Sequence, residues 1–199
     1  LEGSTVPEEP QGIFSFPRGA KAGTFLHDVL EHLDFSQKDS PLMKELVNHK
    51  LREYNYDPVW QETICHMIQK VLTVPLDPEE KDFHLSHIGS NDRLNEVEFY
   101  FPLKSISPKR LKNIFARYGS PKFSVDFPER IERLNFSPLK GFMKGFIDMV
   151  FHYKGRFYLV DWKSNFLGSS VEDYGQQALN TAMEEAFYIL PLSYTHLRA

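Results

Sequence analysis

The feature that most constrains the fold is the segment KGFIDMVFHYKGRFYLVDWKSN at residues 144–165, in which two apolar runs flank the dipeptide Lys154-Gly155. Glycine accepts the positive φ that a tight turn requires, so this pattern is typical of a β-hairpin. We therefore expect two strands, at about residues 142–152 and 156–162. Each strand also carries one aspartate among residues suited to burial, which requires a chemical explanation.

The register of the hairpin follows from its turn. With two loop residues, Tyr153 pairs with Arg156, and counting outward places Asp148 directly opposite Asp161. Opposed residues share a face with Cβ atoms about 4.5–5.5 Å apart, so two like charges are destabilising there unless a cation lies between them. Lys163 shares the face of Asp161 because side chains alternate along a strand. A four-residue loop gives the same pairing, whereas a three-residue loop puts the aspartates on opposite faces.

Two carboxylates and an ammonium group on one face suit a hard divalent cation. Mg²⁺ takes oxygen ligands and is often bound by one or two carboxylates together with substrate phosphate. Such an ion polarises a phosphoryl oxygen and activates water, and a lysine beside it stabilises the charge that develops on phosphorus. The residues alone leave a second interpretation open, in which Asp148 ends a strand while Asp161 and Lys163 form an ordinary surface ion pair.

The composition limits the class of protein. The 199 residues are 41% hydrophobic and 25% charged, as in a globular domain of ordinary size. The net charge of −4 excludes a strongly basic nucleic-acid-binding protein but leaves room for a local basic groove. The single cysteine, Cys65, has no partner for an internal disulfide, which fits a reducing compartment. No apolar run of about 18 residues predicts a membrane span, so we expect no membrane partner.

The rest of the chain predicts helices on both sides of a group of strands. We expect helices at residues 24–35, 41–54, 58–73, 108–118 and 170–190, and a first strand at 95–103. Thr24 is the expected N-cap of the first helix, and Ser170 with Asp173 offers a capping box for the last. Residues 119–140 read as a long connection. This order favours an α/β fold of α+β character, with a helical N-terminal part and a largely antiparallel meander.

Four segments carry a family resemblance in addition to these patterns. They are FPRGAKAGTFLHDVLEHLDF, NEVEFYFPL, LKGFMKGFIDMVFHYKGRFYLVDWKSNFLG and YGQQALNTAM, in this order. Together they resemble the nuclease domain of RecB, the β subunit of the bacterial RecBCD helicase–nuclease (exodeoxyribonuclease V), in the PD-(D/E)XK nuclease superfamily. G-x-I-D with D-x-K-S and an upstream G-T-F-L-H is much more specific than D-x-K alone. The resemblance implies a restriction-endonuclease-like core, with a mixed sheet that contains an antiparallel meander flanked by helices.

The resemblance also implies roles for residues that match the family's motifs. Asp148 and Asp161 would be acidic metal ligands, Lys163 would be the catalytic lysine, and His27 would supply an imidazole ligand to Mg²⁺ from the first helix. By the residue pattern alone, His27 lies on the polar side of that helix with Glu31 and is typical of a solvated surface residue.

Further site residues rest on weaker matches. Glu96 matches the glutamate that begins the family's E-x-x-F strand, although Glu98 shares its face and is the alternative. Tyr174 and Gln177 match a motif on the helix after D-x-K, where a DNA-contacting role and an ordinary amphipathic helix remain alternatives.

The match to the family determines the expected organisation of the chain. We expect a linker at residues 1–18 and a RecB-type nuclease domain at 19–190. Beyond that point the sequence YILPLSYTHLRA departs from the family, and Pro191 breaks a helix that should continue. We therefore expect residues 191–199 to be a non-native tail and the C-terminal part of the domain to be truncated.

The resemblance implies a Mg²⁺-dependent DNA nuclease that acts on single- and double-stranded DNA ends, in double-strand break repair by homologous recombination and in degradation of linear DNA. It implies a bacterial cytoplasmic complex with RecC and RecD. ATP would serve only the helicase part, because this sequence has no G-x-x-x-x-G-K-[ST] phosphate loop. Two alternatives stay open: another PD-(D/E)XK endonuclease, or a catalytically inert nuclease-like scaffold that guides DNA.

Overall fold

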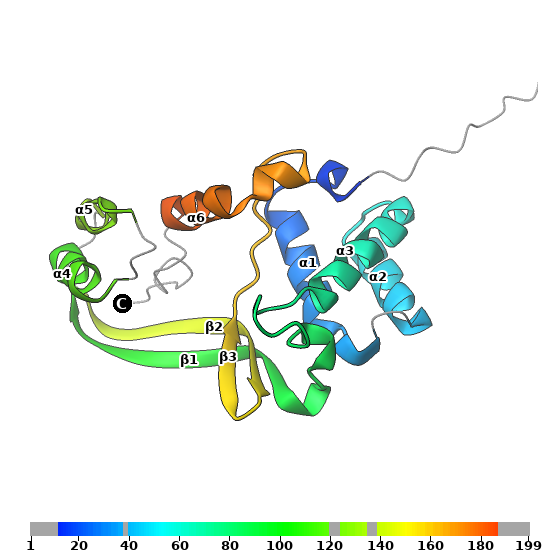
Figure 1. Cartoon of the computed structure of the whole chain (residues 1–199), viewed down its shortest axis with the longest axis horizontal. Coiled ribbons are helices and arrows are strands. Elements are labelled where there is room, and N and C mark those ends of the chain that lie inside the picture. The colour runs from blue at the N-terminus through cyan, green and yellow to red at the C-terminus, as the bar shows by residue number, and fades with distance from the viewer. Residues whose placement is uncertain (1–11, 38–39, 120–123, 135–138, 187–199) are drawn as a thin grey trace, which may run out of the picture. The chain divides into compact units, whose positions relative to one another are not determined.

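The computed structural model describes residues 12–37, 40–119, 124–134 and 139–186 (Figure 1). It confirms the expected combination of helices with an antiparallel sheet. The longer elements are α1 (Ala20–His32), α2 (Pro41–Glu53), α3 (Gln61–Thr73), β1 (Arg93–Ile106), α4 (Pro108–Tyr118), α5 (Phe127–Glu132), β2 (Leu139–Tyr153), β3 (Arg156–Val160) and α6 (Gln176–Glu185). Short 3₁₀ helices are η1 (Ile13–Ser15), η2 (Phe35–Gln37), η3 (Pro58–Trp60), η4 (Leu85–His87), η5 (Ser90–Asp92) and η6 (Val171–Tyr174).

The described chain divides into two compact units. The first contains the residues up to 97 together with 147–169, and the second contains 98–146 together with those from 170 onward. The strands form one sheet in the order β1-β2-β3, and β1 and β2 each contribute residues to both units.

The first unit is built around α1, α2 and α3, which pack in sequence and surround one large apolar cluster. Helix α1 joins this packing through the apolar stripe that the sequence predicts. Phe25, Val29 and Leu30 recur at helical spacing and are buried. Phe16 precedes α1 and packs edge-on against Trp60, with ring centroids 5.3 Å apart. These helices therefore supply a rigid base for the end of the sheet that belongs to this unit.

The β2–β3 hairpin has the register that the sequence predicts. Tyr153 pairs with Arg156, and both turn residues have positive φ, 48° at Lys154 and 78° at Gly155. Met149 and Phe151 of β2 are buried in the apolar cluster of the first unit. Because neighbouring side chains alternate, the opposite face of the hairpin is left outside this cluster.

Among the described residues, the second unit has a much smaller core than the first. Leu111 of α4 packs with Phe127 and Ile131 of α5, and these are the buried members of its apolar cluster. On α6, the buried carboxylate of Glu184 accepts hydrogen bonds from the backbone N–H and the hydroxyl of Ser124, at 2.9 and 2.5 Å. This carboxylate therefore ties α6 to the segment that precedes α5.

Three expectations about the helices are corrected. Thr24 is not an N-cap: α1 begins at Ala20 after Gly19, and the Thr24 hydroxyl donates back to the Ala20 carbonyl oxygen at 3.0 Å. The helix starts early because alanine and lysine are strong helix formers. The expected connection at 119–140 contains α5, whose two buried residues lie four apart and give too short a pattern to stand out.

The last helix is also divided. The capping box of Ser170 and Asp173 is present, but it caps the 3₁₀ helix η6 rather than one long helix. Gly175 then separates η6 from α6, which ends at Glu185. Of the expected linker at residues 1–18, residues 1–11 lie outside the described residues, whereas Ile13–Ser15 form η1 and Phe16 is buried in the large apolar cluster. The expected tail at 191–199 also lies outside the described residues.

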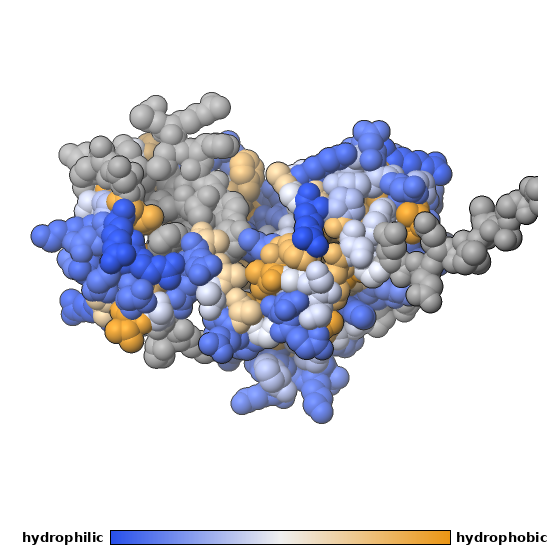
Figure 2. Space-filling view, turned by 90° about the horizontal axis from the view of Figure 1, so that it is seen from above, coloured by the Kyte–Doolittle hydropathy of each residue, from blue (hydrophilic) through white to orange (hydrophobic). Residues whose placement is uncertain are grey.

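Hydrophobic residues also reach the molecular surface, as the orange areas in Figure 2 show for the face drawn there. No helix within the described ranges combines the length and the apolar character that crossing a bilayer requires.

Candidate functional site

The predicted aspartate pair lies where the hairpin ladder ends. The last paired residues are Met149 of β2 and Val160 of β3. Asp148 and Asp161 are the next residues beyond this pair. Asp148 accepts a hydrogen bond from the backbone N–H of Trp162 at 2.5 Å. This side chain therefore holds the segment after β3 against β2 where strand pairing has stopped. Asp148 is mostly enclosed, with 14% of its side chain exposed, whereas Asp161 is 49% exposed.

His27 reaches the same carboxylate from α1. Its Nδ1 lies 3.6 Å from Oδ2 of Asp148, so the two residues that the resemblance pairs as ligands are neighbours in the structure. One turn earlier, Gly23 faces Ser164, which directly follows Lys163. A Cβ atom at Gly23 would lie 3.0 Å from the Ser164 hydroxyl oxygen. The glycine of G-T-F-L-H thus permits the close approach of α1 to the segment that carries the lysine.

Lys163 completes the charged group around the hairpin end. Its ammonium forms an ion pair with the Asp161 carboxylate and also donates to the carbonyl oxygen of Trp162 at 3.3 Å. Its charge acts on Asp148 as well, so the positive group lies near both carboxylates. This is the arrangement expected from alternation along the strand, although Asp161 and Lys163 follow β3 rather than belong to it.

The electrostatic surroundings of Asp148 make its ionised form less favourable than that of a free aspartate. Burial raises the pKa of this carboxyl, and the negative charge of Asp161 raises it further. The N–H of Trp162 and the imidazole of His27 act in the opposite direction but do not cancel the effect. A cation beside Asp148 would therefore relieve an unfavourable charge.

Glu96, rather than Glu98, lies in the electrostatic surroundings of this group. Burial raises the pKa of Glu96, and the charges of Asp148 and Glu31 raise it further. Glu98 belongs to the second unit, where its carboxylate forms an ion pair with Lys144. The two glutamates differ because Glu96 has a φ of 49°, which interrupts the regular alternation on which their shared face was predicted.

The sequence interpretation missed Glu31 as a contributor to the site. Its charge acts on Glu96, and it lies four residues after His27 on α1. That spacing places both side chains on the same side of a helix, which was a signal available in the sequence.

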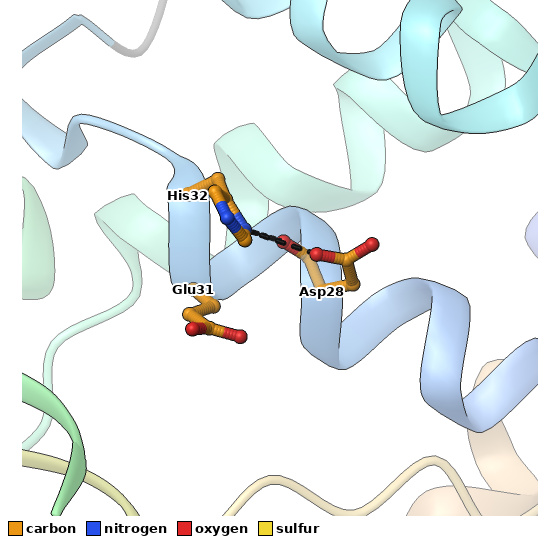
Figure 3. A group of neighbouring side chains, drawn as sticks. All are labelled: Asp28, Glu31 and His32. Atoms are coloured by element: carbon orange, nitrogen blue, oxygen red, sulfur yellow. Dashed lines mark hydrogen bonds and ion pairs between the residues drawn. The ribbon is translucent and has the colours of Figure 1, made fainter. Parts of the chain in front are cut away.

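A second cluster on α1, formed by Asp28, Glu31 and His32, is tied to α2 through Asp28. The ligand atoms of Asp28, Glu31 and His32 lie within 4.8 Å of one another, and Figure 3 shows His32 facing Asp28. Asp28 also forms an ion pair at 2.8 Å with the buried ammonium of Lys50 on α2. Burial acts most strongly on the Asp28 pKa and would raise it, but hydrogen bonds from Lys50 and Tyr54 together lower it. Asp28 therefore links α1 to α2.

The donor set around Asp148 fits a magnesium ion in its chemistry. Carboxylate oxygens are the ligands that Mg²⁺ prefers, and the group carries more negative than positive charge. Among the described residues, however, His27, Asp148 and Asp161 do not bring their ligand atoms within 4.8 Å of one another. Because one oxygen of the Asp161 carboxylate is paired with Lys163, a bound ion would share this carboxylate with the ammonium or replace it there.

Two remaining predicted residues belong to the second unit. Tyr174 ends η6, and the exposed Gln177 lies in the first turn of α6, on the other side of Gly175. Their DNA-contacting role stays a prediction.

Comparisons with known proteins give a consistent set of relatives. No family model matches the chain. It is 37% identical over 94% of its length to the RecBCD enzyme subunit RecB of Escherichia coli (strain K12), and 32% identical over 91% to the subunit of the same name in Haemophilus influenzae. The corresponding subunit of Mycolicibacterium smegmatis is 30% identical over 95% of the chain. The chain spans only 15%, 14% and 19% of the lengths of these three relatives.

Proposed function

The chain belongs to the RecB family, of whose members it spans only a part, and we propose that it is a Mg²⁺-dependent DNA nuclease domain. The observation that carries the proposal is the convergence of separate elements on Asp148. His27 comes from α1, Glu96 from β1, and Asp161 with Lys163 from the segment after β3. A purely structural hairpin end has no need of so many charged groups around a mostly buried carboxylate.

The proposed chemistry assigns one role to each group. Asp148, Asp161 and His27 would hold the ion, with Glu96 as a further carboxylate. Mg²⁺ bound there supplies polarisation of a phosphoryl oxygen and activation of water. Lys163, once released from Asp161, donates from Nζ to the charge that develops on the phosphate oxygens. Hydrolysis then breaks the bond between phosphorus and the 3′ oxygen, and water supplies the new oxygen on phosphorus.

The biological setting is proposed from the relatives' name and from what the family resemblance implies. A RecB-type subunit would act in a complex with RecC and RecD in the bacterial cytoplasm, on single- and double-stranded DNA ends. Its exodeoxyribonuclease V activity would serve double-strand break repair by homologous recombination and degradation of linear DNA. The ATP-driven helicase would lie in another part of such a subunit.

Cleavage assays on linear duplex and single-stranded DNA test the proposal. With Mg²⁺ the native chain should degrade both, and EDTA should stop it. Asp148→Asn and Asp161→Ala should each lower the rate by on the order of 10²–10³-fold, because each removes a charged ligand. Asp82→Asn is the matched control, because Asp82 is exposed and lies outside the charged group.

Two results would contradict the proposal. If Asp148→Asn and Asp161→Ala cleave as fast as Asp82→Asn, the site is wrongly placed. If the native chain binds DNA but does not cleave it with Mg²⁺, even after extension with the corresponding C-terminal RecB sequence, the inert DNA-guiding scaffold is the better interpretation.

A further inference from the structure

The second unit carries exposed aromatic side chains on its part of the sheet. Tyr100 on β1 is 60% exposed, and Phe142 and Phe146 on β2 are 67% and 52% exposed. Phe142, Lys144 and Phe146 occupy alternate positions of β2, so they leave the same face of the strand and extend over about 13 Å. Large exposed rings gathered in this way mark an interaction surface more often than scattered single residues do.

Lys144 brings the two strands together on this face. Its ammonium lies 5.4 Å from the ring centroid of Tyr100 and 5.4 Å from that of Phe146. The same ammonium forms an ion pair with Glu98, and both groups are exposed. Exposed ion pairs contribute little free energy, so Lys144 is able to exchange Glu98 for an external anion.

The charge of this part of the chain is opposite in sign to that of the whole. Residues 98–146 contain ten Lys and Arg residues against four Asp and Glu residues, a formal charge of +6, whereas the complete chain carries −4. Several of these cations are exposed on or near the helices that follow β1, namely Lys109, Arg110, Arg117 and Arg133. The local basic region that the net charge left open therefore lies in the second unit.

We propose that Tyr100, Phe142, Lys144 and Phe146 form a binding face for single-stranded DNA. Unpaired bases stack on exposed rings, whereas the bases of a duplex are already stacked on one another and do not offer their faces. The exposed cations of the same unit complement the phosphate backbone, which no apolar protein partner would require. The choice of DNA rests on the proposed nuclease function, but the face itself is separate from the charged group at Asp148.

Fluorescence anisotropy in EDTA, where no cleavage occurs, measures this binding with a labelled oligothymidylate. Tyr100→Leu, Phe142→Leu and Phe146→Leu remove a ring while keeping an apolar side chain, and each should lower affinity at least about fivefold. An oligomer of abasic residues has the same phosphates without bases, and its affinity should not change in these variants. Lys144→Gln should reduce the dependence of log affinity on log salt by about 0.7.

Phe101→Leu is the matched control. Phe101 is 56% exposed and adjoins Tyr100, but its side chain leaves the opposite face of β1. Equal losses in the control and the ring variants, equal losses for the abasic oligomer, or no DNA binding by the native chain would overturn the proposal. Cleavage without ring-dependent binding overturns this proposal alone, whereas ring-dependent binding without cleavage in Mg²⁺ overturns the nuclease proposal alone.

Discussion

The two units of the chain differ in how they use apolar side chains. The first buries nineteen residues in one cluster drawn from its helices and from the hairpin. Among the described residues, the second buries three in its own cluster, Leu111, Phe127 and Ile131, and leaves several large rings exposed on its strands. The first unit also holds the charged group at Asp148, whereas the basic segment lies in the second.

This difference separates two physical requirements. A mostly buried carboxylate such as Asp148 costs free energy unless hydrogen-bond and charge partners lie beside it, and a large close-packed core holds such partners in place. A face that binds a flexible strand needs accessible rings and cations instead, and a small core is enough to support it. We therefore expect substitutions in the first unit to lower stability or cleavage, and substitutions on the strands of the second unit to lower DNA binding.

The largest expected effect is on stability. Phe25→Ala should lower the free energy of unfolding by about 3–5 kcal/mol, because Phe25 is fully buried in the large cluster. Phe127→Ala should cost less, because its small cluster has partly buried neighbours that can collapse around the deletion. Trp60 and Trp162 both lie in the first unit, so tryptophan fluorescence follows that unit alone while far-UV circular dichroism follows both.

The two probes report the unfolding of the two units separately. Phe127→Ala should move the circular dichroism transition and leave the fluorescence transition in place. A coincident shift of both transitions would mean that the two units unfold as one cooperative body. Their separate stabilities, expected from their different cores, would then be wrong.

The next effect distinguishes the two glutamates of β1. Glu96→Gln should lower Mg²⁺-dependent cleavage by on the order of 10- to 100-fold, because it removes a negative charge beside Asp148. Glu98→Gln should leave cleavage intact and tighten the binding of single-stranded DNA, because it frees Lys144. Steady-state cleavage rates and anisotropy titrations measure both effects. If Glu98→Gln lowers the cleavage rate more than Glu96→Gln does, Glu98 is the glutamate that belongs to the site.

The smallest effect is a pH dependence of stability in EDTA. Since burial raises the pKa of Asp148 in the folded chain, ionisation of this group favours unfolding. Below the unfolded-state pKa of about 3.9, the native chain and Asp148→Asn should be equally stable. As pH rises through the folded-state pKa the native chain should lose stability relative to the variant.

Thermal unfolding, followed by tryptophan fluorescence, measures this difference. The measurements run from about pH 3 to about pH 7, which is roughly the range over which carboxyl groups titrate. Added Mg²⁺ should stabilise the native chain but not the variant. A variant that is the less stable of the two at neutral pH in EDTA would show that the Asp148 charge is already compensated by the folded chain.

Much of the fold could be predicted because its signals are local. The α4 helix has the bounds expected from its periodicity, and the hairpin has the register expected from its turn. The sequence did not predict α5, because two buried residues are too few to define a period. The predicted start of α1 was too late, because the internal Thr24 resembles an N-cap. Local patterns locate an element well only when the element is long enough to repeat them.

Residue patterns alone predict that Asp148 lies opposite Asp161 with Lys163 beside them, provided that the turn has two or four residues. The structure has the two-residue turn, which removes the three-residue alternative. Residue patterns alone did not predict that His27 and Glu96 lie near Asp148. Helix α1 reaches Asp148 because the core packs it there and Gly23 lets it approach Ser164, and Glu96 enters through a positive φ that breaks its strand's alternation. Contacts between residues distant in sequence depend on how the elements pack, so these contacts became visible only in the folded chain.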